Sequence, residues 1–283
     1  MFEIIRKEEL AANIKLIEVT APEIAAKARP GQFIILRIDE KGERIPLTIA
    51  DFDREKGTLV LIFQEVGRST RDMGQMKEGD KILDLVGPLG RASEIGKYGR
   101  VICIGGGVGI APVYPITRAL KESGNEVIAI IGARSREQLI LAEEMQAASD
   151  QIYIASDDGS IGEPGFVTDI LANILAQDVV VDLIVAIGPL PMMKAVSEIS
   201  RPYQIKTIVS MNPIMVDGTG MCGACRVAVG SETKFACVDG PEFDGHQIDW
   251  SIAQARSRMF AEEENIAMQH NCSGGECRCQ KIK

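Results

Sequence analysis

The sequence predicts a β-barrel followed by an α/β domain and a small, cysteine-rich C-terminal part. In roughly the first hundred residues, short apolar runs are separated by turn signals about every eight to twelve residues, as in a small antiparallel barrel. From residue 98, apolar strands alternate with helical stretches, which is typical of a parallel sheet covered on both faces. After residue 209 this regularity fades, and six of the seven cysteines follow. We expect a barrel over 1–97, an α/β domain over 98–208, a metal-binding segment over 209–245, and a C-terminal helix with a cysteine-rich tail over 246–283.

Composition argues against several classes of partner. The 283 residues carry a formal charge of −9, whereas nucleic acids and anionic membranes are recognised by basic surfaces. No run of about 18 apolar residues is free of Gly, Pro or a charge, so no membrane span is predicted. The charged start MFEIIRKEEL is unlike a signal peptide, and an odd number of cysteines then favours metal ligation over disulfides. We expect a cytoplasmic protein with no nucleic-acid and no membrane partner.

The barrel region contains two short motifs suited to binding a phosphate. Its strands are expected over 2–7, 13–21, 31–39, 44–53, 57–66 and 80–90, with a helix over 69–76. Arg44 has a planar fork of donors that suits a phosphate or the polar edge of a flavin, and Thr48 adds a hydroxyl. Gly67, Ser69 and Thr70 open the predicted helix and offer donors to a pyrophosphate. Taken alone, a Ser-Thr pair at this place is more often a simple helix cap.

Three loops of the α/β region are expected at one edge of its sheet. Strands are expected over 100–109, 126–133, 151–156 and 181–188, and helices over 111–124, 135–149 and 165–177. The glycine-rich turn CIGGGVGIAP closes the first strand and opens the first helix, where N–H groups and the helix dipole can bind a phosphate. It departs from the strict G-x-G-x-x-G pattern, because Pro112 stands at the third glycine. The loops 156–169 and 186–193 also follow strands, and together the three loops predict a dinucleotide site.

The cysteine pattern indicates an iron–sulfur site with one ligand in question. Cys222, Cys225 and Cys237 fit the plant-type order C-x4-C-x2-C with a distant last cysteine, except that Asp217 stands at the first position. Asp217 is either a carboxylate ligand or a turn residue before Gly218, in which case the cluster is absent or held by a tail cysteine. The tail has the composition of a second metal site and is left unassigned; its candidate ligands are His270, Cys272, Cys277 and Cys279.

The order of motifs along nearly the whole chain resembles the ferredoxin-reductase-type flavoproteins. The motifs are R-x-P-x-T at 44–48, G-x-S-T at 67–70, G-P-x-G at 87–90, G-G-G-x-G-x-A-P at 105–112 and G-P-x-x-M-M at 188–193. This resemblance implies an FAD-binding barrel and an α/β domain that binds a nicotinamide dinucleotide. A two-iron cluster segment after this pair narrows the resemblance to the electron-transfer subunits of dihydroorotate dehydrogenase and their relatives.

The resemblance and the three loops together nominate three sets of cofactor contacts. The FAD contacts are Arg44, Pro46, Leu47, Thr48, Gly67, Ser69 and Thr70, of which Thr48 and Arg44 are assigned to the reaction centre. The dinucleotide contacts are Gly105, Gly106, Gly107, Gly109, Ala111, Pro112, Arg134, Asp157, Asp158, Gly188, Pro189 and Met192. The ligands of a 2Fe-2S cluster in the 209–245 segment are Asp217, Cys222, Cys225 and Cys237.

The implied activity is an exchange of hydride between NAD(H) and FAD, followed by single-electron transfer through the cluster to a larger flavin/iron–sulfur partner subunit. Asp217, together with Ile187 where most members have cysteine, favours the group of electron-bifurcating NADH-dependent ferredoxin:NADP oxidoreductases over dihydroorotate dehydrogenases. A non-catalytic redox sensor is the less favoured alternative. Ser135 and Arg136 would suit NADPH, whereas the resemblance favours NAD(H) with Arg134 at the adenosine ribose. We predict NAD(H).

Overall fold

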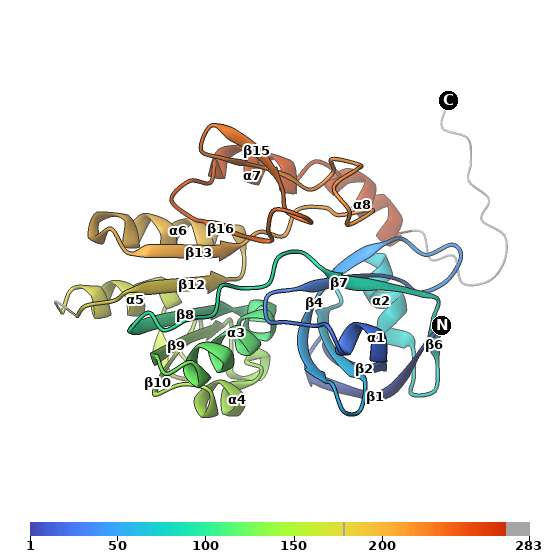
Figure 1. Cartoon of the computed structure of the whole chain (residues 1–283), viewed down its shortest axis with the longest axis horizontal. Coiled ribbons are helices and arrows are strands. Elements are labelled where there is room, and N and C mark those ends of the chain that lie inside the picture. Colours follow the sequence, from blue (N-terminus) through green and yellow to red (C-terminus); the bar gives the residue numbers. More distant parts are fainter. Residues whose placement is uncertain (178, 270–283) are drawn as a thin grey trace.

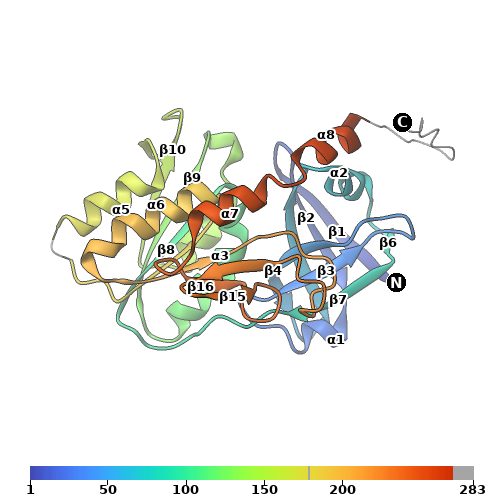
Figure 2. The ribbon, with the colours of Figure 1, turned by 90° about the horizontal axis from the view of Figure 1, so that it is seen from above.

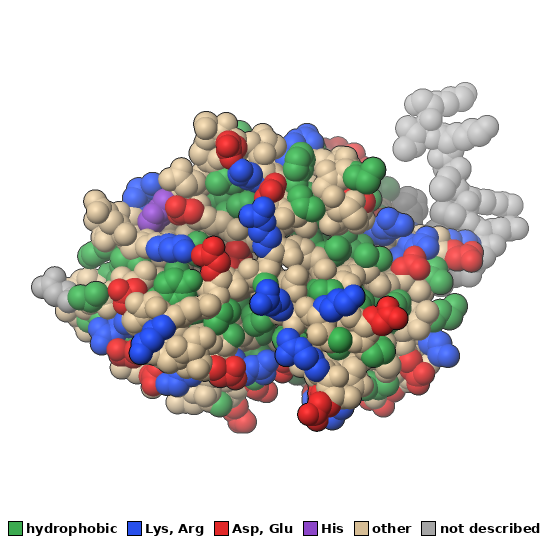
Figure 3. Space-filling view, viewed as in Figure 1, with side chains coloured by type: hydrophobic (Ala, Val, Ile, Leu, Met, Phe, Trp, Pro, Cys, Tyr) green, Lys and Arg blue, Asp and Glu red, His purple; other side chains and the backbone are tan. Residues whose placement is uncertain are grey.

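The computed structural model describes residues 1–177 and 179–269 of the chain. A β-barrel and an α/β domain lie side by side, and residues 211–269 run across both (Figure 1). Seen from above, this C-terminal part passes from the α/β domain to the barrel (Figure 2). Figure 3 shows basic and acidic side chains intermixed over the face viewed in Figure 1. In the described ranges, no helix is long and apolar enough to cross a bilayer. The predicted ligands of the tail, His270, Cys272, Cys277 and Cys279, lie outside the described residues.

The first sheet is an antiparallel barrel, as predicted. Its strands are β1 (Phe2–Ala11), β2 (Ile14–Thr20), β3 (Phe33–Arg37), β4 (Ile45–Asp53), β5 (Thr58–Gln64), β6 (Lys81–Ile82) and β7 (Asp84–Leu89). The strand order is β6-β1-β2-β5-β4-β3-β7. Since β6 and β7 are almost continuous in the chain yet lie at opposite edges, this stretch brings the two edges of the sheet together. Inward side chains such as Ile17, Leu61 and Ile34 are fully buried and form the barrel core.

Two short helices accompany the barrel. The predicted helix near Ser69 is α2 (Arg68–Gln75), which begins after Gly67. A single helical turn, α1 (Pro22–Ala25), is not among the predicted elements; Pro22 occupies its first position, where the missing N–H has no helical partner to lose.

The second sheet is mainly parallel and also matches the prediction. Its strands are β8 (Arg100–Gly106), β9 (Glu126–Ala133), β10 (Gln151–Ser156), β11 (Glu163–Pro164), β12 (Leu183–Ile187), β13 (Lys206–Ser210) and β16 (Glu242–Asp244). They follow the order β11-β10-β9-β8-β12-β13-β16, in which only β16 pairs antiparallel. The chain adds strands in one direction from β8 to β10 and in the other from β12 to β13. The order therefore reverses between β8 and β12, and open α/β sheets bind ligands at such a point.

Helices cover both faces of this sheet (Figure 1). One face carries α3 (Ile110–Glu122) and α4 (Ala142–Ala147), whose buried side chains share a hydrophobic cluster with Val101 and Cys103 of β8. The other carries α5 (Val167–Leu175) and α6 (Leu190–Ser200), whose buried side chains share a cluster with Ile102 and Ile104. Because neighbouring residues of β8 are buried on opposite faces, the strand is apolar throughout, as the sequence indicates. Cys103 is one of these fully buried residues.

The expected helix over 135–149 is wrong. The chain forms only a short 3-10 turn, η2 (Arg136–Gln138), before α4. It is extended at Leu139 and left-handed at Leu141, with φ of 52°. This interruption places Ile140 in the core beneath the sheet, where it is 2% exposed. Burial of this side chain outweighs the helical preference of the flanking residues.

The C-terminal part also differs from a single long helix. Two helices, α7 (Trp250–Ser257) and α8 (Ala261–Gln269), replace the one C-terminal helix expected within 246–283. A hairpin of β14 (Arg226–Val229) and β15 (Glu232–Phe235) precedes them. Two further 3-10 turns are η1 (Gly107–Gly109) and η3 (Arg201–Tyr203). In this way α8 reaches the barrel beside α2 (Figure 2).

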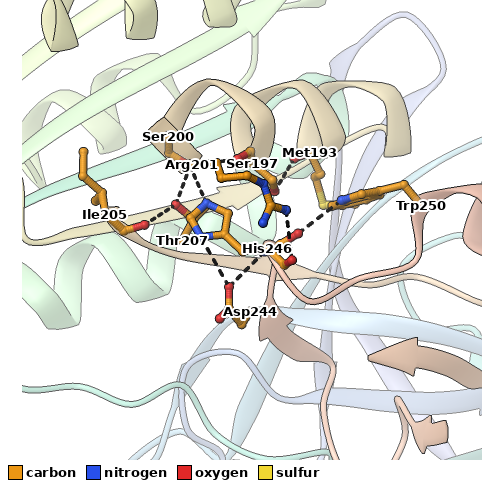
Figure 4. Close-up of polar contacts among 10 residues, drawn as sticks. Met193, Ser197, Ser200, Arg201, Ile205, Thr207, Asp244, His246 and Trp250 are labelled. Carbon is orange, nitrogen blue, oxygen red and sulfur yellow. Dashed lines mark hydrogen bonds and ion pairs between the residues drawn. The ribbon is translucent and has the colours of Figure 1, made fainter. Parts of the chain in front are cut away.

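A polar network fixes the corner after β16 against α6 (Figure 4). Ser200 Oγ lies 3.0 Å from His246 Nε2 and accepts a hydrogen bond from Thr207 Oγ1 at 2.7 Å. His246 Nδ1 is 3.9 Å from Asp244 Oδ1, which is too long for a hydrogen bond. Ser200 is fully buried, so this serine, histidine and aspartate hold the corner in place and cannot present a nucleophile to a substrate. His246 is thus a packing residue.

Candidate functional site

A cavity of about 920 Å³ lies where the barrel meets the α/β domain. Its walls come from β3, β4 and β5, from the carboxyl ends of β8, β9, β10 and β12, and from the residues after β13. The predicted cofactor contacts that line it are Pro46, Leu47, Thr48, Thr70, Gly106, Gly107, Gly109, Ala111, Pro112, Arg134, Asp157, Gly188, Pro189 and Met192. Those that do not line it are Arg44, Gly67, Ser69, Gly105 and Asp158. The cavity is at the upper end of the range for ligand sites, which suits large cofactors.

The glycine turn and the 186–193 loop meet at the point where the strand order reverses. A Cβ on Gly109 would lie 2.3 Å from the Ile187 carbonyl oxygen. Gly109 has φ of −64°, so close approach of the two loops, rather than an unusual backbone, requires glycine here. Gly107 has φ of +56°, a left-handed conformation that favours glycine. The turn brings the first N–H groups of α3 to the cavity wall, where they and the helix dipole can bind a pyrophosphate.

Charged residues follow β9 and β10 at the far end of the cavity. Backbone hydrogen bonds join the two loops, with Asp158 N donating to Arg134 O at 3.2 Å. Arg134 and Asp157 line the cavity, whereas the Asp158 carboxylate accepts from Ser160 N at 2.9 Å. Hydrogen bonds from Ser160 lower the pKa of Asp158. Asp157 is therefore the acidic group that faces the cavity.

Two further residues near this end differ in position: Arg136 lies outside the cavity, and Phe166 lies in its wall. Arg136 does not line the cavity, and its Nε donates to Ser160 O at 3.3 Å. Phe166 is not among the predicted contacts, yet it lines the cavity and is 62% exposed. The signal in the sequence was a large aromatic residue in the loop 156–169, which follows a strand of the parallel sheet at the edge where ligands bind.

The barrel side of the cavity is formed by β4 and the start of α2. Thr48 lies in β4, and its neighbours Pro46 and Leu47 share the same wall. At the start of α2, Gly67 N donates to Thr70 Oγ1 at 3.0 Å, so Thr70 both caps the helix and lines the cavity. Arg44 is exposed ahead of β4, and no described contact joins it to the cavity. Its contact with a flavin stays a prediction.

Three of the predicted cluster ligands, Asp217, Cys222 and Cys225, lie on one loop. The fourth, Cys237, lies in the turn that follows β15 and packs against this loop. Cys225 and Cys237 are buried, with their sulfurs 3.2 Å apart, and Cys222 is exposed. The Asp217 carboxylate accepts from Thr219 N and Cys222 N, each at 2.8 Å. These hydrogen bonds lower the pKa of Asp217, and burial raises the pKa of the Cys237 thiol to about 12.

This donor set fits an iron–sulfur cluster in its chemistry. Among the described residues, no three His, Cys, Asp or Glu side chains are already gathered as a closed metal site. Asp217 uses its oxygens to organise the loop, but a carboxylate has about four lone-pair positions, so an oxygen can accept an N–H and also bind iron. With the three thiols, this carboxylate would complete a set of four donors. Asp217 holds the turn in this structure, and its role as a ligand stays a prediction.

The loop that carries Asp217 starts at the cavity wall. Met211, Asn212 and Met215 line the cavity and are not among the predicted contacts. Met211 N donates to Pro241 O at 2.8 Å, which ties this segment to the turn after Cys237. A Cβ on Gly218 would lie 2.7 Å from Ile35 Cδ1, so the loop rests directly on the barrel. The run MNPIM directly after the last parallel strand was the signal, since loops at that edge bind ligands.

Comparison with known proteins decides the family. Residues 103–198 match the oxidoreductase NAD-binding domain, and residues 212–249 match the iron–sulfur cluster binding domain of dihydroorotate dehydrogenase B. A Thermotoga maritima protein, described as a homologue of the dihydroorotate dehydrogenase B (NAD(+)) electron transfer subunit, is 47% identical over 94% of this chain and 93% of its own length. The chain belongs to the dihydroorotate dehydrogenase B electron transfer subunit family.

Other family members and solved structures agree with this assignment. The electron transfer subunit of Listeria monocytogenes (strain EGD-e) is 34% identical over 87% of this chain and 97% of its own length. A chain of the NADH-dependent reduced ferredoxin-NADP oxidoreductase, solved in work on flavin-based electron bifurcation, has a TM-score of 0.90 and is 46% identical, covering 95% of this chain and 97% of its own. Phthalate dioxygenase reductase shares the fold alone, at a TM-score of 0.58 and 18% identity over 81% of this chain and 86% of its own.

Membership of the electron transfer subunit family confirms the predicted fold class and the nature of the protein. The chain is an NAD(H) oxidoreductase subunit of the flavoprotein type, with an electron-transfer role. The predicted set of FAD, NAD(H) and an iron–sulfur cluster is confirmed at the level of the family and its domains. As an electron transfer subunit it works with a partner subunit.

Proposed function

We propose that this chain is the small subunit of an electron-bifurcating, NADH-dependent ferredoxin:NADP oxidoreductase. One observation carries the proposal: a single cavity is lined by β4 of the barrel, by the glycine turn before α3, and by the segment that leads to Asp217. A flavin and a nicotinamide bound there would meet each other beside the iron–sulfur loop. The likeness to the solved bifurcating enzyme, at 46% identity, supports the choice within the family.

The residues of this chain would bind and orient the cofactors and keep water away from them. Pro46, Leu47 and Thr48 would support the flavin ring, with Arg44 and the start of α2 toward its phosphates. The glycine turn and α3 would hold the dinucleotide pyrophosphate. When bound, FAD, NAD(H) and the cluster would supply the redox chemistry, namely hydride exchange between the two cofactors and single-electron transfer to the cluster. No side chain needs to act as an acid or a base. The units 1–97, 98–208, 209–245 and 246–283 stay our proposal for the domains.

We further propose Asp217, Cys222, Cys225 and Cys237 as the cluster ligands. Burial of Cys225 and Cys237 against each other supports this set, and so does the position of the Asp217 carboxylate over the Cys222 amide. A carboxylate is a harder donor than a thiolate, so it should change the reduction potential from the value of a four-cysteine site.

We propose NADH rather than NADPH as the electron donor. Asp157 faces the cavity, where its carboxylate can accept from a ribose hydroxyl but would repel a 2′-phosphate. Arg136, which could otherwise bind that phosphate, is held by Ser160. We expect Asp157→Asn to lower the ratio of kcat/KM for NADH over NADPH by about tenfold, or ~1.4 kcal/mol.

Stopped-flow flavin reduction with both dinucleotides measures this ratio. The matched control is Glu163→Gln, because Glu163 is an exposed acid of β11 that does not line the cavity and is not among the predicted contacts. The control should keep the wild-type ratio. A wild-type preference for NADPH that disappears in Arg136→Ala would show that NADH is the wrong donor.

A larger flavin/iron–sulfur subunit is the proposed partner, and the cytoplasm is the proposed location, supported by the free state of all four described cysteines.

The second candidate function is the electron transfer subunit of dihydroorotate dehydrogenase, which the names of the curated relatives favour. The subunit that co-purifies separates the two: a dihydroorotate-oxidising partner would support the second candidate.

A further inference from the structure

Two arginines hold consecutive carbonyl groups of the loop between Cys222 and Cys225. Arg226 Nη1 donates to Gly223 O at 2.9 Å, and Arg256 Nη2 donates to Ala224 O at 2.8 Å. The second contact joins positions 32 residues apart in the sequence. Arg256 Nε is buried and has no partner among the described residues. The two guanidinium groups therefore bind the C-x2-C loop itself, and each retains a full positive charge.

The elements that carry these arginines are tied together. Arg226 is the first residue of β14, and Arg256 lies in the last turn of α7. Asp249 caps α7 by accepting from Ser251 N and Ile252 N, each at 3.0 Å, while its own N donates to Ala228 O of β14 at 3.0 Å. The helix and the hairpin thus present both guanidinium groups to one loop from fixed positions.

The contacts set the direction of the peptide groups. Within the described residues, the cis peptide bonds are Gly87-Pro88 and Gly240-Pro241, so the peptides after Gly223 and Ala224 are trans. In a trans peptide the C=O and the following N–H point in opposite directions. The N–H groups of Ala224 and Cys225 therefore point away from the arginines that hold the carbonyls of the same peptides.

Other N–H groups of the same loop already point at the predicted ligands. Asp217 accepts from Thr219 N and Cys222 N, each at 2.8 Å. The loop thus turns two N–H donors toward Asp217 and two carbonyls toward the arginines. Hydrogen bonds to sulfur and nearby charge are the main protein influences on the potential of an iron–sulfur cluster.

We propose that Arg226 and Arg256 are positioning residues that hold the cluster loop and raise the reduction potential of the cluster. This inference rests on the proposed ligand set. Positive charge and N–H donors stabilise the reduced cluster, which carries one more negative charge than the oxidised form. Removing the arginines should therefore make the cluster harder to reduce.

The test compares Arg226→Gln, Arg256→Gln and the double variant of the holoprotein with wild type. Iron and flavin are counted first, and the cluster is then titrated potentiometrically with EPR detection. We expect a more negative potential in each variant, with the double variant shifted by about tenfold in the one-electron equilibrium, or ~59 mV. Arg256→Lys keeps the charge and a donor, so its potential should lie between those of wild type and Arg256→Gln.

The matched control is Arg258→Gln, which removes the same charge two residues further along the chain. Arg258 is exposed, and its side chain has no hydrogen bond or ion pair with any residue in the described ranges. Loss of iron in the Arg226 or Arg256 variants but not in this control would also support the loop-holding role. Fully loaded variants with the potential of the control would overturn the proposal. An unchanged cluster spectrum in Asp217→Ala would instead reject the ligand set, so the two failures can be told apart.

Discussion

Replacing Asp217 with alanine is expected to abolish the EPR signal of the reduced cluster, and replacing it with cysteine is expected to retain the cluster at a different potential. Alanine removes one of four proposed donors, whereas cysteine restores the four-thiolate pattern. The cost in iron affinity should exceed the roughly 10- to 100-fold that is typical of losing a residue outside the metal's own ligand set. Iron analysis and low-temperature EPR after dithionite reduction measure both effects.

Asp239→Ala is the matched control for the loss of a carboxylate near the cluster. Asp239 lies two residues after Cys237, and its carboxylate accepts from Phe235 N at 2.8 Å, so it supports a turn of the same segment. The control should keep about two irons per chain. If Asp217→Ala keeps the wild-type spectrum and iron content, Asp217 is only the turn residue before Gly218.

Replacing Gly109 with alanine is expected to weaken NADH use strongly while sparing the cluster. The new Cβ would lie 2.3 Å from the Ile187 carbonyl oxygen and 2.7 Å from Gly188 Cα, both of them backbone atoms. The two loops must separate, which should destabilise the fold by about 1–3 kcal/mol. Displacement of the dinucleotide by about 1 Å can cost up to roughly 100-fold in rate, and we expect kcat/KM for NADH to fall by at least about tenfold.

Gly96→Ala provides the comparison for this glycine. A Cβ there would meet only the Tyr98 ring, at 3.8 Å, which is an ordinary contact outside the cavity. Thermal unfolding and stopped-flow reduction should show wild-type behaviour for Gly96→Ala. Equal kcat/KM in both alanine variants would mean that the meeting of the two loops does not matter for NADH.

The elements predicted well are those whose burial repeats along the chain. The strands β8 and β12 are apolar throughout because helices cover both faces, and the barrel strands are short apolar runs bounded by turn residues. The glycine turn before α3 was equally easy to predict, since the strand, turn and helix are adjacent in sequence. These local patterns are enough to bring most of the predicted cofactor contacts to a single cavity.

The elements predicted poorly depend on contacts between distant residues. Burial of Ile140 interrupts the helix expected over 135–149, and nothing in its neighbours indicates that interruption. Likewise, α6 and β13 are not among the predicted elements: α6 begins within the Pro-rich motif that was interpreted only as a loop, and β13 is short. The cavity residues Met211 and Met215 are near Pro241 only because β16 pairs with β13.

The candidate cluster site also combines features that local sequence predicts with features that depend on distant contacts. The spacing of Cys222, Cys225 and Cys237 is local and identifies a cluster segment, which the family comparison confirms. The contact of Arg256 with Ala224 spans 32 residues and has no signature in the sequence. Arg44, assigned to the flavin by its motif, lies outside the cavity, because it precedes the strand whose side chains form the wall.

The most direct test of the central claim is an anaerobic titration of the purified chain with NADH, followed by visible absorption and low-temperature EPR, with iron counted beforehand. The account predicts about two irons per chain, bleaching of the flavin by NADH, and the appearance of a reduced-cluster signal as electrons pass from the flavin. A chain that binds flavin and iron but shows no bleaching with NADH, or that bleaches without any cluster signal, would contradict it.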